Sequence, residues 1–471
     1  MGVDRGVAAG TGGLRCRVEP SDPEIVWVLD QLAEWLGVQR LNVVPGDARP
    51  HLHYGPGEPA PGAAIVVRPA PRDLLWPAAI EGAIEPVLLP RELPFDLLAA
   101  TAALLVDRPH GTSQPGALDG HGRLTFAASV PARNGFGERA IVDRYALLFA
   151  ALAAERLGVV ARPLWPEGRQ AAIGLSHDVD HPDRYPHARL LRRPWRLLRD
   201  PRTLLRAALE EERRARQDPR REAWPFDALR ASEARRGFRS TFFFAATSRL
   251  ARNSSLLDVP YDIRESRFVD LMRALRDDGV EVGLHASYRA HAVPGMLAAE
   301  KDRLERVAGT QVHGLRHHYW QLGPDPAATL GTHAEAGFQY DSSLAFNDHP
   351  GFRRSVARGF NPFDAARGRA LGTRQLPVFC MDGSVLYVSE NVDAAVASVA
   401  GALAEVRAVG GLGVIDWHAE TSIPDGARPA WGTAYQEFLD LAAADPGPWV
   451  TDLGSIDRWL SERAAASVPI S

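Results

Sequence analysis

The sequence places two aspartates and two histidines directly after a run of mostly apolar residues. Residues 173–181 read Ile-Gly-Leu-Ser-His-Asp-Val-Asp-His. Carboxylates at the end of a buried strand are costly unless they pair with a cation or bind a metal. Because Asp178 and Asp180 are two residues apart on such a loop, they can face one site, where one binds a cation and the other holds a water molecule. The structural alternative is a pair of turn aspartates that cap the following segment.

Four later segments show the same pattern, an apolar run that ends in a polar or charged side chain. Residues 280–288 read Val-Glu-Val-Gly-Leu-His-Ala-Ser-Tyr, residues 313–319 read His-Gly-Leu-Arg-His-His-Tyr, residues 339–343 read Gln-Tyr-Asp-Ser-Ser, and residues 413–420 read Gly-Val-Ile-Asp-Trp-His-Ala-Glu. One histidine after a strand is more often structural than catalytic. Five such strand ends in one region favour a shared site, to which we expect Asp178, His285, Arg316, Asp341 and His418 to contribute.

These segments lie in a part of the chain that alternates short strands with helices. We expect strands at residues 171–175, 240–244, 280–284, 312–315, 338–340, 375–379 and 413–416, and helices at residues 268–277, 296–307, 332–336 and 392–409. Such alternation is typical of a parallel sheet or barrel, and barrel enzymes carry their sites at the carboxyl ends of the strands. We therefore predict a distorted (β/α) barrel of about seven strands over residues 166–471.

Two further regions precede or interrupt the predicted barrel. Residues 1–165 show helical periodicity at 25–36, 95–106 and 141–157 and strand-like runs at 41–44 and 64–67, which predicts a smaller α/β accessory domain. Residues 184–222 hold 13 arginines against six acidic residues, a local charge of +7. We expect a basic helical insertion there. It is either a lid or surface for an anionic partner, or a solvated helix whose leucines pack on the domain.

The composition excludes several classes of protein. The chain has 471 residues, of which 45% are hydrophobic and 24% charged, and its 54 basic and 58 acidic residues leave a net charge of −4. No global basic field therefore indicates nucleic acid as a partner. The two cysteines cannot form a disulfide framework, and no apolar stretch reaches the roughly 20 residues needed to cross a bilayer. We expect a cytoplasmic protein without a transmembrane segment, and the oligomeric state is left open.

In their order along the chain, the motifs S-H-D-V-D, G-L-H-A-S-Y, R-H-H-Y, Y-D-S-S and W-H resemble those of the polysaccharide deacetylases, the NodB-homology proteins of carbohydrate esterase family 4. The resemblance is to the branch whose first motif is H-D-V-D and which carries an extra N-terminal domain. It implies a metal-dependent hydrolase that acts on non-peptide C–N bonds. The implied substrate is an acetylated sugar or glycan, and the implied cofactor is one divalent metal ion, with Zn²⁺ the expected one.

Matched position by position, the resemblance implies a role for each motif residue. Asp178 matches the catalytic base, Arg316 matches the arginine that pairs with it, and His418 matches the general acid. The implied metal ligands are Asp180, His285 and a further histidine. The usual position of that histidine holds Arg289. The third ligand is therefore open between His318, which we prefer, and His291.

Three more residues are expected around the substrate. Tyr319 matches the residue whose backbone N–H holds the oxyanion, Trp417 is expected as a wall of the sugar pocket, and Asp341 is expected to support Arg316. Two alternatives to a sugar deacetylase stay open. Arg289 at a ligand position favours a non-catalytic glycan-binding or scaffold protein with a degenerate site, and a hydrolase of a non-sugar C–N bond would use the same fold.

Overall fold

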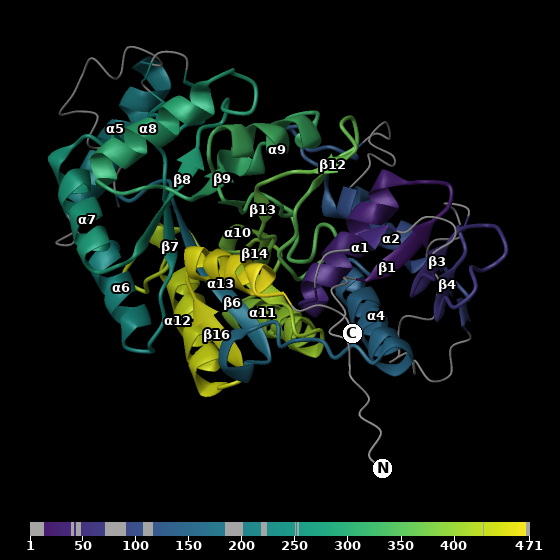
Figure 1. Cartoon of the computed structure of the whole chain (residues 1–471). Helices are drawn as coiled ribbons and strands as arrows, with labels where there is room; N and C mark the ends of the chain where they lie inside the picture. Colours follow the sequence, from purple (N-terminus) through teal and green to yellow (C-terminus); the bar gives the residue numbers. More distant parts are fainter. Residues whose placement is uncertain are drawn as a thin grey trace.

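The computed structural model describes residues 14–38, 42–43, 49–70, 91–106, 116–183, 201–217, 224–249, 251, 254–426 and 428–467. Within them the chain forms two main sheets, one of five strands and one of nine, with helices around both (Figure 1). The larger sheet is built from the second part of the chain. The prediction of a distorted (β/α) barrel preceded by a smaller α/β region is confirmed.

The smaller sheet is parallel throughout and has the order β2-β1-β3-β4-β5. Its strands are β1 (Arg15–Val18), β2 (Asn42–Val43), β3 (Leu52–Tyr54), β4 (Ile65–Val67) and β5 (Glu92–Leu93), and its main helices are α1 (Pro23–Leu36), α2 (Leu97–Val106) and α4 (Ile141–Leu157). The sequence explains the limits of α1. Asp22 caps its first turn by accepting from the N–H groups of Glu24 and Ile25, and Gly37 ends it with a φ of 74°.

The larger sheet is also parallel along its path and has the order β13-β10-β9-β8-β7-β6-β15-β14, with β16 paired to β6. The strands are β6 (Ala171–Val179), β7 (Thr241–Phe244), β8 (Glu281–Ala286), β9 (Gly314–His317), β10 (Tyr340–Asp341), β13 (Arg374–Gln375), β14 (Val378–Met381), β15 (Leu412–Asp416) and β16 (Pro448–Thr451). A two-stranded sheet of β11 (Phe363–Asp364) and β12 (Arg369–Ala370) lies apart from it.

The larger sheet has nine strands where about seven were expected, for two reasons. Residues 375–379, expected as one strand, divide into β13 and β14 around Pro377, which has no N–H to offer a ladder. These two strands, adjacent in sequence, lie at opposite ends of the sheet order. The sheet therefore curls so far that its two edge strands, β13 and β14, come from one short segment of the chain. The second reason is β16, a short strand that the periodicity did not indicate.

The remaining helices follow or connect these strands. They are α3 (Val130–Arg133), α5 (Pro201–Ala215), α6 (Phe226–Ala234), α7 (Ser266–Asp277), α8 (Met296–Ala308), α9 (Pro326–Glu335), α10 (Asp382–Leu386), α11 (Val392–Ala408), α12 (Pro429–Ala444) and α13 (Leu453–Ala465). Side chains alternate between the two faces of the curled sheet. Phe242 and Phe244 pack into the cluster shared with the outer helices, whereas Phe243 packs into a separate cluster with Val414 and with Leu453 of α13.

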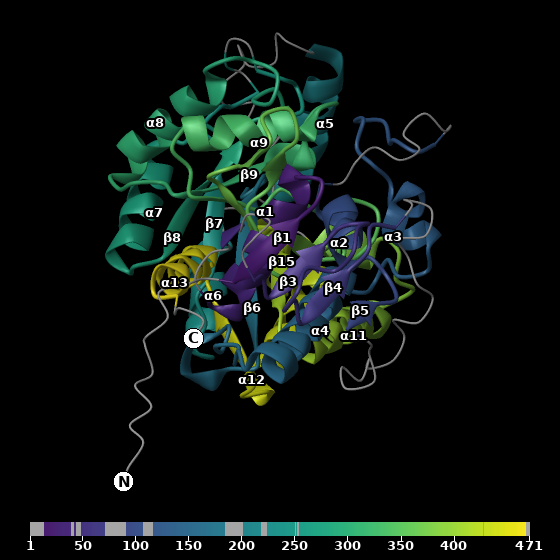
Figure 2. The same ribbon diagram turned by 45° about the vertical axis from the view of Figure 1, so that its right-hand side comes forward.

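The apolar core of the smaller sheet extends into the barrel region. The apolar cluster of the first 165 residues also contains side chains from the barrel region, namely Leu322, Leu330, Leu344, Val356, Phe360, Phe363 and Leu371. Asp143 of α4, fully buried, forms an ion pair of 2.7 Å with Arg358. Helix α1 contacts β12, and Arg144 of α4 pairs with Glu405 of α11, so helices of the N-terminal region lie against the barrel region (Figure 1 and Figure 2). The boundary expected near residue 165 stays a prediction, and the apolar core of the first region extends across it.

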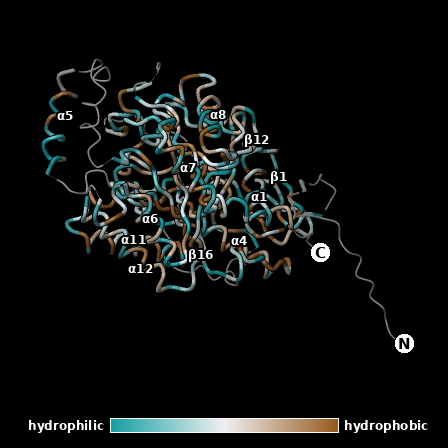
Figure 3. The backbone as a smooth tube through the Cα atoms, turned by 90° about the vertical axis from the view of Figure 1, so that its left-hand side faces the viewer, coloured by the Kyte–Doolittle hydropathy of each residue, from teal (hydrophilic) through white to brown (hydrophobic). Residues whose placement is uncertain are grey.

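The basic insertion expected at residues 184–222 is only partly described. Its helix α5 lies at the edge of the molecule (Figure 3), while residues 184–200 and 218–222 lie outside the described residues. Leu205 and Leu209 of α5 are 41% and 56% exposed. This contradicts, for these two leucines, the alternative in which the leucines of the insertion pack on the domain. Among the described residues, no helix combines the length and the apolar character needed to cross a membrane.

Candidate active site

The central strand β6 carries both aspartates of the first motif to the interior of the curled sheet. All nine of its residues are buried, and its alternation sends Ser176 and Asp178 to the inner face while His177 points outward. His177 is bonded on that outer side to the Trp417 carbonyl oxygen (2.6 Å) and to Glu233 (2.8 Å). His177 thus has a structural role, and the inner face is left to the two aspartates.

Three side chains, one from β8 and two from the segments that directly follow β6 and β9, meet at the carboxyl edge of the sheet. The ligand atoms of Asp180, His285 and His318 all lie within 4.8 Å of one another. The Nε2 atom of His285 lies 3.2 Å from one carboxylate oxygen of Asp180, and the Nε2 atom of His318 lies 3.2 Å from the other. The expected ligand set, with His318 as its third member, is therefore brought together.

The chemistry of these three residues fits a divalent metal. Asp180 Oδ1 and His285 Nε2 are buried and have no hydrogen-bond partner among the described residues, although they lie 3.2 Å apart. The Nδ1 atom of His285 lies 3.1 Å from the Arg316 carbonyl oxygen and donates there, so Nε2 is the ring nitrogen that faces Asp180. Burial alone would lower the pKa of His285, but Asp178 and Asp180 raise it to about 9. The cluster thus favours a positive charge, and a metal ion would supply it.

The histidine considered as the other candidate for the third ligand lies elsewhere. His291 places its Nδ1 atom 3.1 Å from the carbonyl oxygen of Tyr288, and its ring lines a cavity of about 960 Å³ between the N-terminal region and the barrel. Arg289, at the usual ligand position, is exposed to solvent. His318 is delivered instead by the turn that follows β9.

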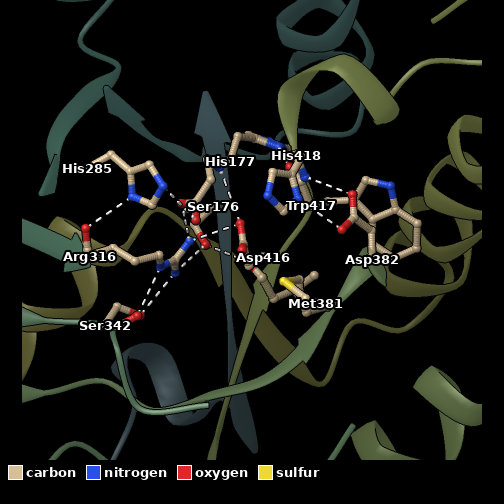
Figure 4. A network of polar contacts seen from close by, with 12 residues as sticks. Ser176, His177, His285, Arg316, Ser342, Met381, Asp382, Asp416, Trp417 and His418 are labelled. Atoms are coloured by element: carbon tan, nitrogen blue, oxygen red, sulfur yellow. Dashed lines mark hydrogen bonds and ion pairs between the residues drawn. The ribbon is translucent and has the colours of Figure 1, made fainter. Parts of the chain in front are cut away.

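A second group of side chains surrounds the buried guanidinium of Arg316 (Figure 4). Its Nη1 atom lies 2.9 Å from Asp178 Oδ1 and 3.0 Å from Asp416 Oδ1. Its other nitrogens donate to Ser176 and Ser342. Burial alone would raise the pKa of Asp178, but His285, Arg316 and His418 hold it below its ordinary value. Asp178 is therefore ionised at neutral pH. Arg316 binds its Oδ1 atom and leaves the Oδ2 atom for other contacts.

The geometry also distinguishes two places where a cation could sit. Asp178, Asp416 and His418 form a second group with metal-ligand spacing. The guanidinium of Arg316 already lies against both carboxylates of that group. The group of Asp180, His285 and His318 is therefore the better metal site.

The last member of the site is His418, which follows β15. Its Nδ1 atom lies 2.9 Å from Asp382 Oδ1, and its Nε2 atom lies 3.6 Å from Asp180 Oδ2. Asp382 is itself held by the hydroxyl of Thr421 and by the backbone N–H groups of His418 and Gly383. The carboxylate therefore fixes which ring nitrogen carries the proton and aims the other toward the metal cluster.

Replacing Arg316 by methionine should lower the free energy of unfolding by about 3–5 kcal/mol, because two buried carboxylates lose their cation. Urea denaturation measures this difference. The control is Arg273→Met, which breaks an exposed pair with Asp270 and should cost less than about 1 kcal/mol. Equal losses in the two variants would mean that Arg316 does not neutralise the site.

Two expected site residues point away from it. Asp341 is in register with Leu315 rather than with Arg316, so it lies on the outer face and bonds to Ser343. The expectation that Asp341 supports Arg316 or borders the substrate is wrong. Trp417 follows the inward-facing Asp416, is buried, and packs on Tyr435 of α12 at 5.3 Å. It is a core residue and not a pocket wall.

Tyr319 does lie beside the metal cluster. Its ring centroid is 4.7 Å from that of His318, and its φ of 60° is in the left-handed region. The role of its backbone N–H stays a prediction.

Sequence reasoning missed two carboxylates of the site, Asp382 and Asp416. Asp416 lies in the motif of residues 413–420, where the sequence predicts roles only for Trp417 and His418. Asp382 comes directly after β14, so the signal of a polar residue at a strand end was present there too. Because Pro377 divides that run into two strands, its end was placed too early along the chain.

The comparisons with known proteins add the following. No protein-family model and no curated protein matches the sequence. Among solved structures, a Mycobacterium smegmatis protein assigned as a polysaccharide deacetylase is 20% identical (65% of this chain, 95% of that chain, TM-score 0.43). The PuuE allantoinase is 15% identical (64% and 93%, TM-score 0.40). A mutant of a family 4 carbohydrate esterase pseudoenzyme with restored activity is 11% identical (61% and 67%, TM-score 0.28). At these values, the function of this chain has to be argued from its own residues.

Proposed function

We propose that the protein is a metal-dependent hydrolase of the polysaccharide deacetylase type, which removes acetyl groups from an N-acetylated or O-acetylated sugar or glycan intermediate. One observation carries the proposal. The metal-ligand cluster of Asp180, His285 and His318 has two side chains beside it, the carboxylate of Asp178, which is paired with Arg316, and the imidazole of His418, which is paired with Asp382. Hydrolysis of an amide needs a base on one side of the carbonyl carbon and an acid on the other.

The residues divide the work as follows. A divalent ion such as Zn²⁺, when bound by Asp180, His285 and His318, would polarise the acetyl carbonyl and make water a better nucleophile. Asp178 accepts the proton of the attacking water. Arg316 keeps that carboxylate ionised and oriented, because it binds Oδ1 and leaves Oδ2 to act. Tyr319, at the edge of the cluster, is proposed to donate its backbone N–H to the oxyanion.

His418 then protonates the leaving nitrogen. Its Nε2 atom points to the cluster, and Asp382 on the opposite ring nitrogen stabilises the protonated ring. An amine leaves only after it has been protonated. The Asp178–Arg316 pair thus accepts the proton of the water, and the Asp382–His418 pair supplies the proton of the leaving nitrogen.

A degenerate, non-catalytic site is disfavoured by the position of His318. Arg289 was the feature that suggested it, since it stands where a ligand histidine is usual. The His318 ring, from a different loop, lies against Asp180 and completes the ligand set.

The test measures metal and product together. The protein is purified without chelators, its metal content is determined, and acetate release is followed with N-acetylated and O-acetylated sugars beside cyclic amides and ureides. We expect close to one ion per chain and acetate release from a sugar. Less than about 0.1 ion per chain would overturn the proposal, and turnover of the ureides alone would replace the sugar by a non-sugar C–N substrate.

Asp382→Asn should lower kcat by roughly 10²-fold while metal content stays the same. The asparagine removes the negative charge that stabilises protonated His418 and can leave the ring in the wrong tautomer. Steady-state kinetics and metal analysis of the same preparation measure the two quantities. Asp270→Asn on the exposed face of α7 serves as the control for a lost carboxylate. Unchanged kcat in Asp382→Asn would remove His418 from the role of acid.

A further inference from the structure

The turn that carries His318 has an unusual backbone. Directly after β9, Tyr319 has a φ of 60° and Trp320 a φ of 53°. Large aromatic residues rarely adopt this left-handed region, and each such residue costs on the order of 1–3 kcal/mol unless its surroundings hold it there. Since His318 immediately precedes the two, its place in the ligand cluster depends on whatever holds this turn.

Arg123, which lies 195 residues before His318 in the N-terminal region, reaches the turn directly. Its Nη1 atom donates to the carbonyl oxygen of Tyr319 at 2.8 Å and to Asn347 Oδ1 at 3.0 Å, and its guanidinium lies 5.8 Å from the centre of the Tyr319 ring. An ion pair of 2.6 Å with Asp119 fixes the guanidinium from the other side. The side chain is only 9% exposed. Arg123 is therefore held in place and donates to the carbonyl oxygen of the peptide bond between Tyr319 and Trp320.

The same N-terminal segment also contacts the loop that follows His285, the other histidine of the ligand cluster. The backbone carbonyl of His121 accepts from Gln321 Nε2 at 2.8 Å, just beyond the turn. The Nδ1 atom of His121 lies 3.0 Å from the hydroxyl of Tyr288, three residues after His285. Residues 119–123 thus contact both the loop after β8, the strand that carries His285, and the turn that carries His318.

We propose that Arg123 is a positioning residue of the metal site, which holds the turn of Tyr319 and Trp320 and thereby the ring of His318. The N-terminal region would then be part of the active site rather than an accessory to it. The inference rests on the proposed function in that it takes Asp180, His285 and His318 as the metal ligands. Arg123 itself lies outside all five motifs on which the proposed function was based.

The test is zinc affinity of the full chain, measured by competition with a chromophoric chelator. Groups that orient metal ligands typically affect affinity by 10- to 100-fold, and we expect Arg123→Met to weaken zinc binding by that amount. The matched control is Arg144→Met. Arg144 also links the N-terminal region to the barrel, through an ion pair of 2.6 Å with Glu405, and in the part of the chain that the structure describes it has no hydrogen bond or ion pair with the turn. Its zinc affinity should equal that of the wild type.

Arg123→Lys provides the second measurement. Lysine keeps the charge beside Asp119 and can donate to the Tyr319 carbonyl, but it lacks the planar fork that reaches Asn347 as well. We expect its zinc affinity to lie between those of the wild type and Arg123→Met, and it replaces Arg123→Met should that variant fail to fold.

The outcomes separate the positioning role from the proposed function. Wild-type zinc affinity in folded Arg123→Met, or an equal loss in Arg144→Met, would overturn the positioning role. A wild-type protein that binds no zinc would overturn the proposed function and this inference with it. Weakened zinc binding in Arg123→Met, in a protein that releases no acetate from any substrate, would leave the positioning role standing while the proposed function fails.

Discussion

Replacing Asp178 by asparagine is expected to abolish acetate release while the metal stays bound. Asp178 lies next to the ligand cluster, with Oδ2 3.6 Å from His285 Nε2, but it is tied to Arg316 and not to the metal site. General bases contribute about 10²–10⁴ in rate. We expect a loss near the upper end, about 10⁴-fold in kcat, because the amide cannot accept a proton and also leaves Arg316 without one of its two counter-charges.

The control for this prediction is the other aspartate of the same motif. Asp180→Asn should lose both metal and activity, since Asp180 contacts His285 and His318 with its two oxygens. Metal analysis and kcat, measured on both variants, therefore separate a base from a ligand. Metal loss in Asp178→Asn, or activity within about tenfold of the wild type, would show that the two roles are wrongly divided.

Most of the site could be predicted because its residues lie at the ends of parallel strands. The carboxyl ends of such strands meet at one edge of a sheet, whatever the order in which the strands pair. Asp178, His285, Arg316 and His418 each end or follow an apolar run, so their convergence required no knowledge of strand order. The same reasoning places Asp382 at that edge once β14 is seen to end at Met381.

The direction of each side chain was harder to predict than its position along the chain. Asp341 and Arg316 both lie near strand ends, but the register pairs Asp341 with Leu315. A difference of one residue reverses the face of a strand, and a strand of two residues has no alternating pattern from which the face could be deduced. Trp417 shows the same effect, because it follows Asp416, which faces inward.

The contribution of the N-terminal region was beyond the reach of sequence patterns. Arg123 and His121 lie in a loop, and they act through a carbonyl oxygen and a tyrosine hydroxyl that are far away in sequence. A loop carries no periodicity that would show which way it folds. Only the packing of the N-terminal region against the barrel region, both of which contribute to one apolar cluster, brings this loop to the metal cluster.

Replacing His318 by alanine is expected to remove the metal, whereas replacing His291 by alanine is expected to leave it bound. His318 supplies one of three ligand atoms, and zinc sites with three protein ligands do not retain the ion well on two. We expect the zinc content to fall from about one ion per chain to below about 0.1, with loss of acetate release. Metal analysis after gel filtration and the acetate assay measure both.

The comparison is fair because His291 is also chemically able to bind a metal. Burial lowers its pKa, so its ring is neutral and has a lone pair to offer. What excludes it is position, since His291 lines the cavity between the N-terminal region and the barrel, whereas the histidines grouped with Asp180 are His285 and His318. Zinc retained in His318→Ala and lost in His291→Ala would mean that the loop after β8 rearranges to supply the ligand. In that case the turn after β9, and Arg123 with it, would have no part in holding the metal.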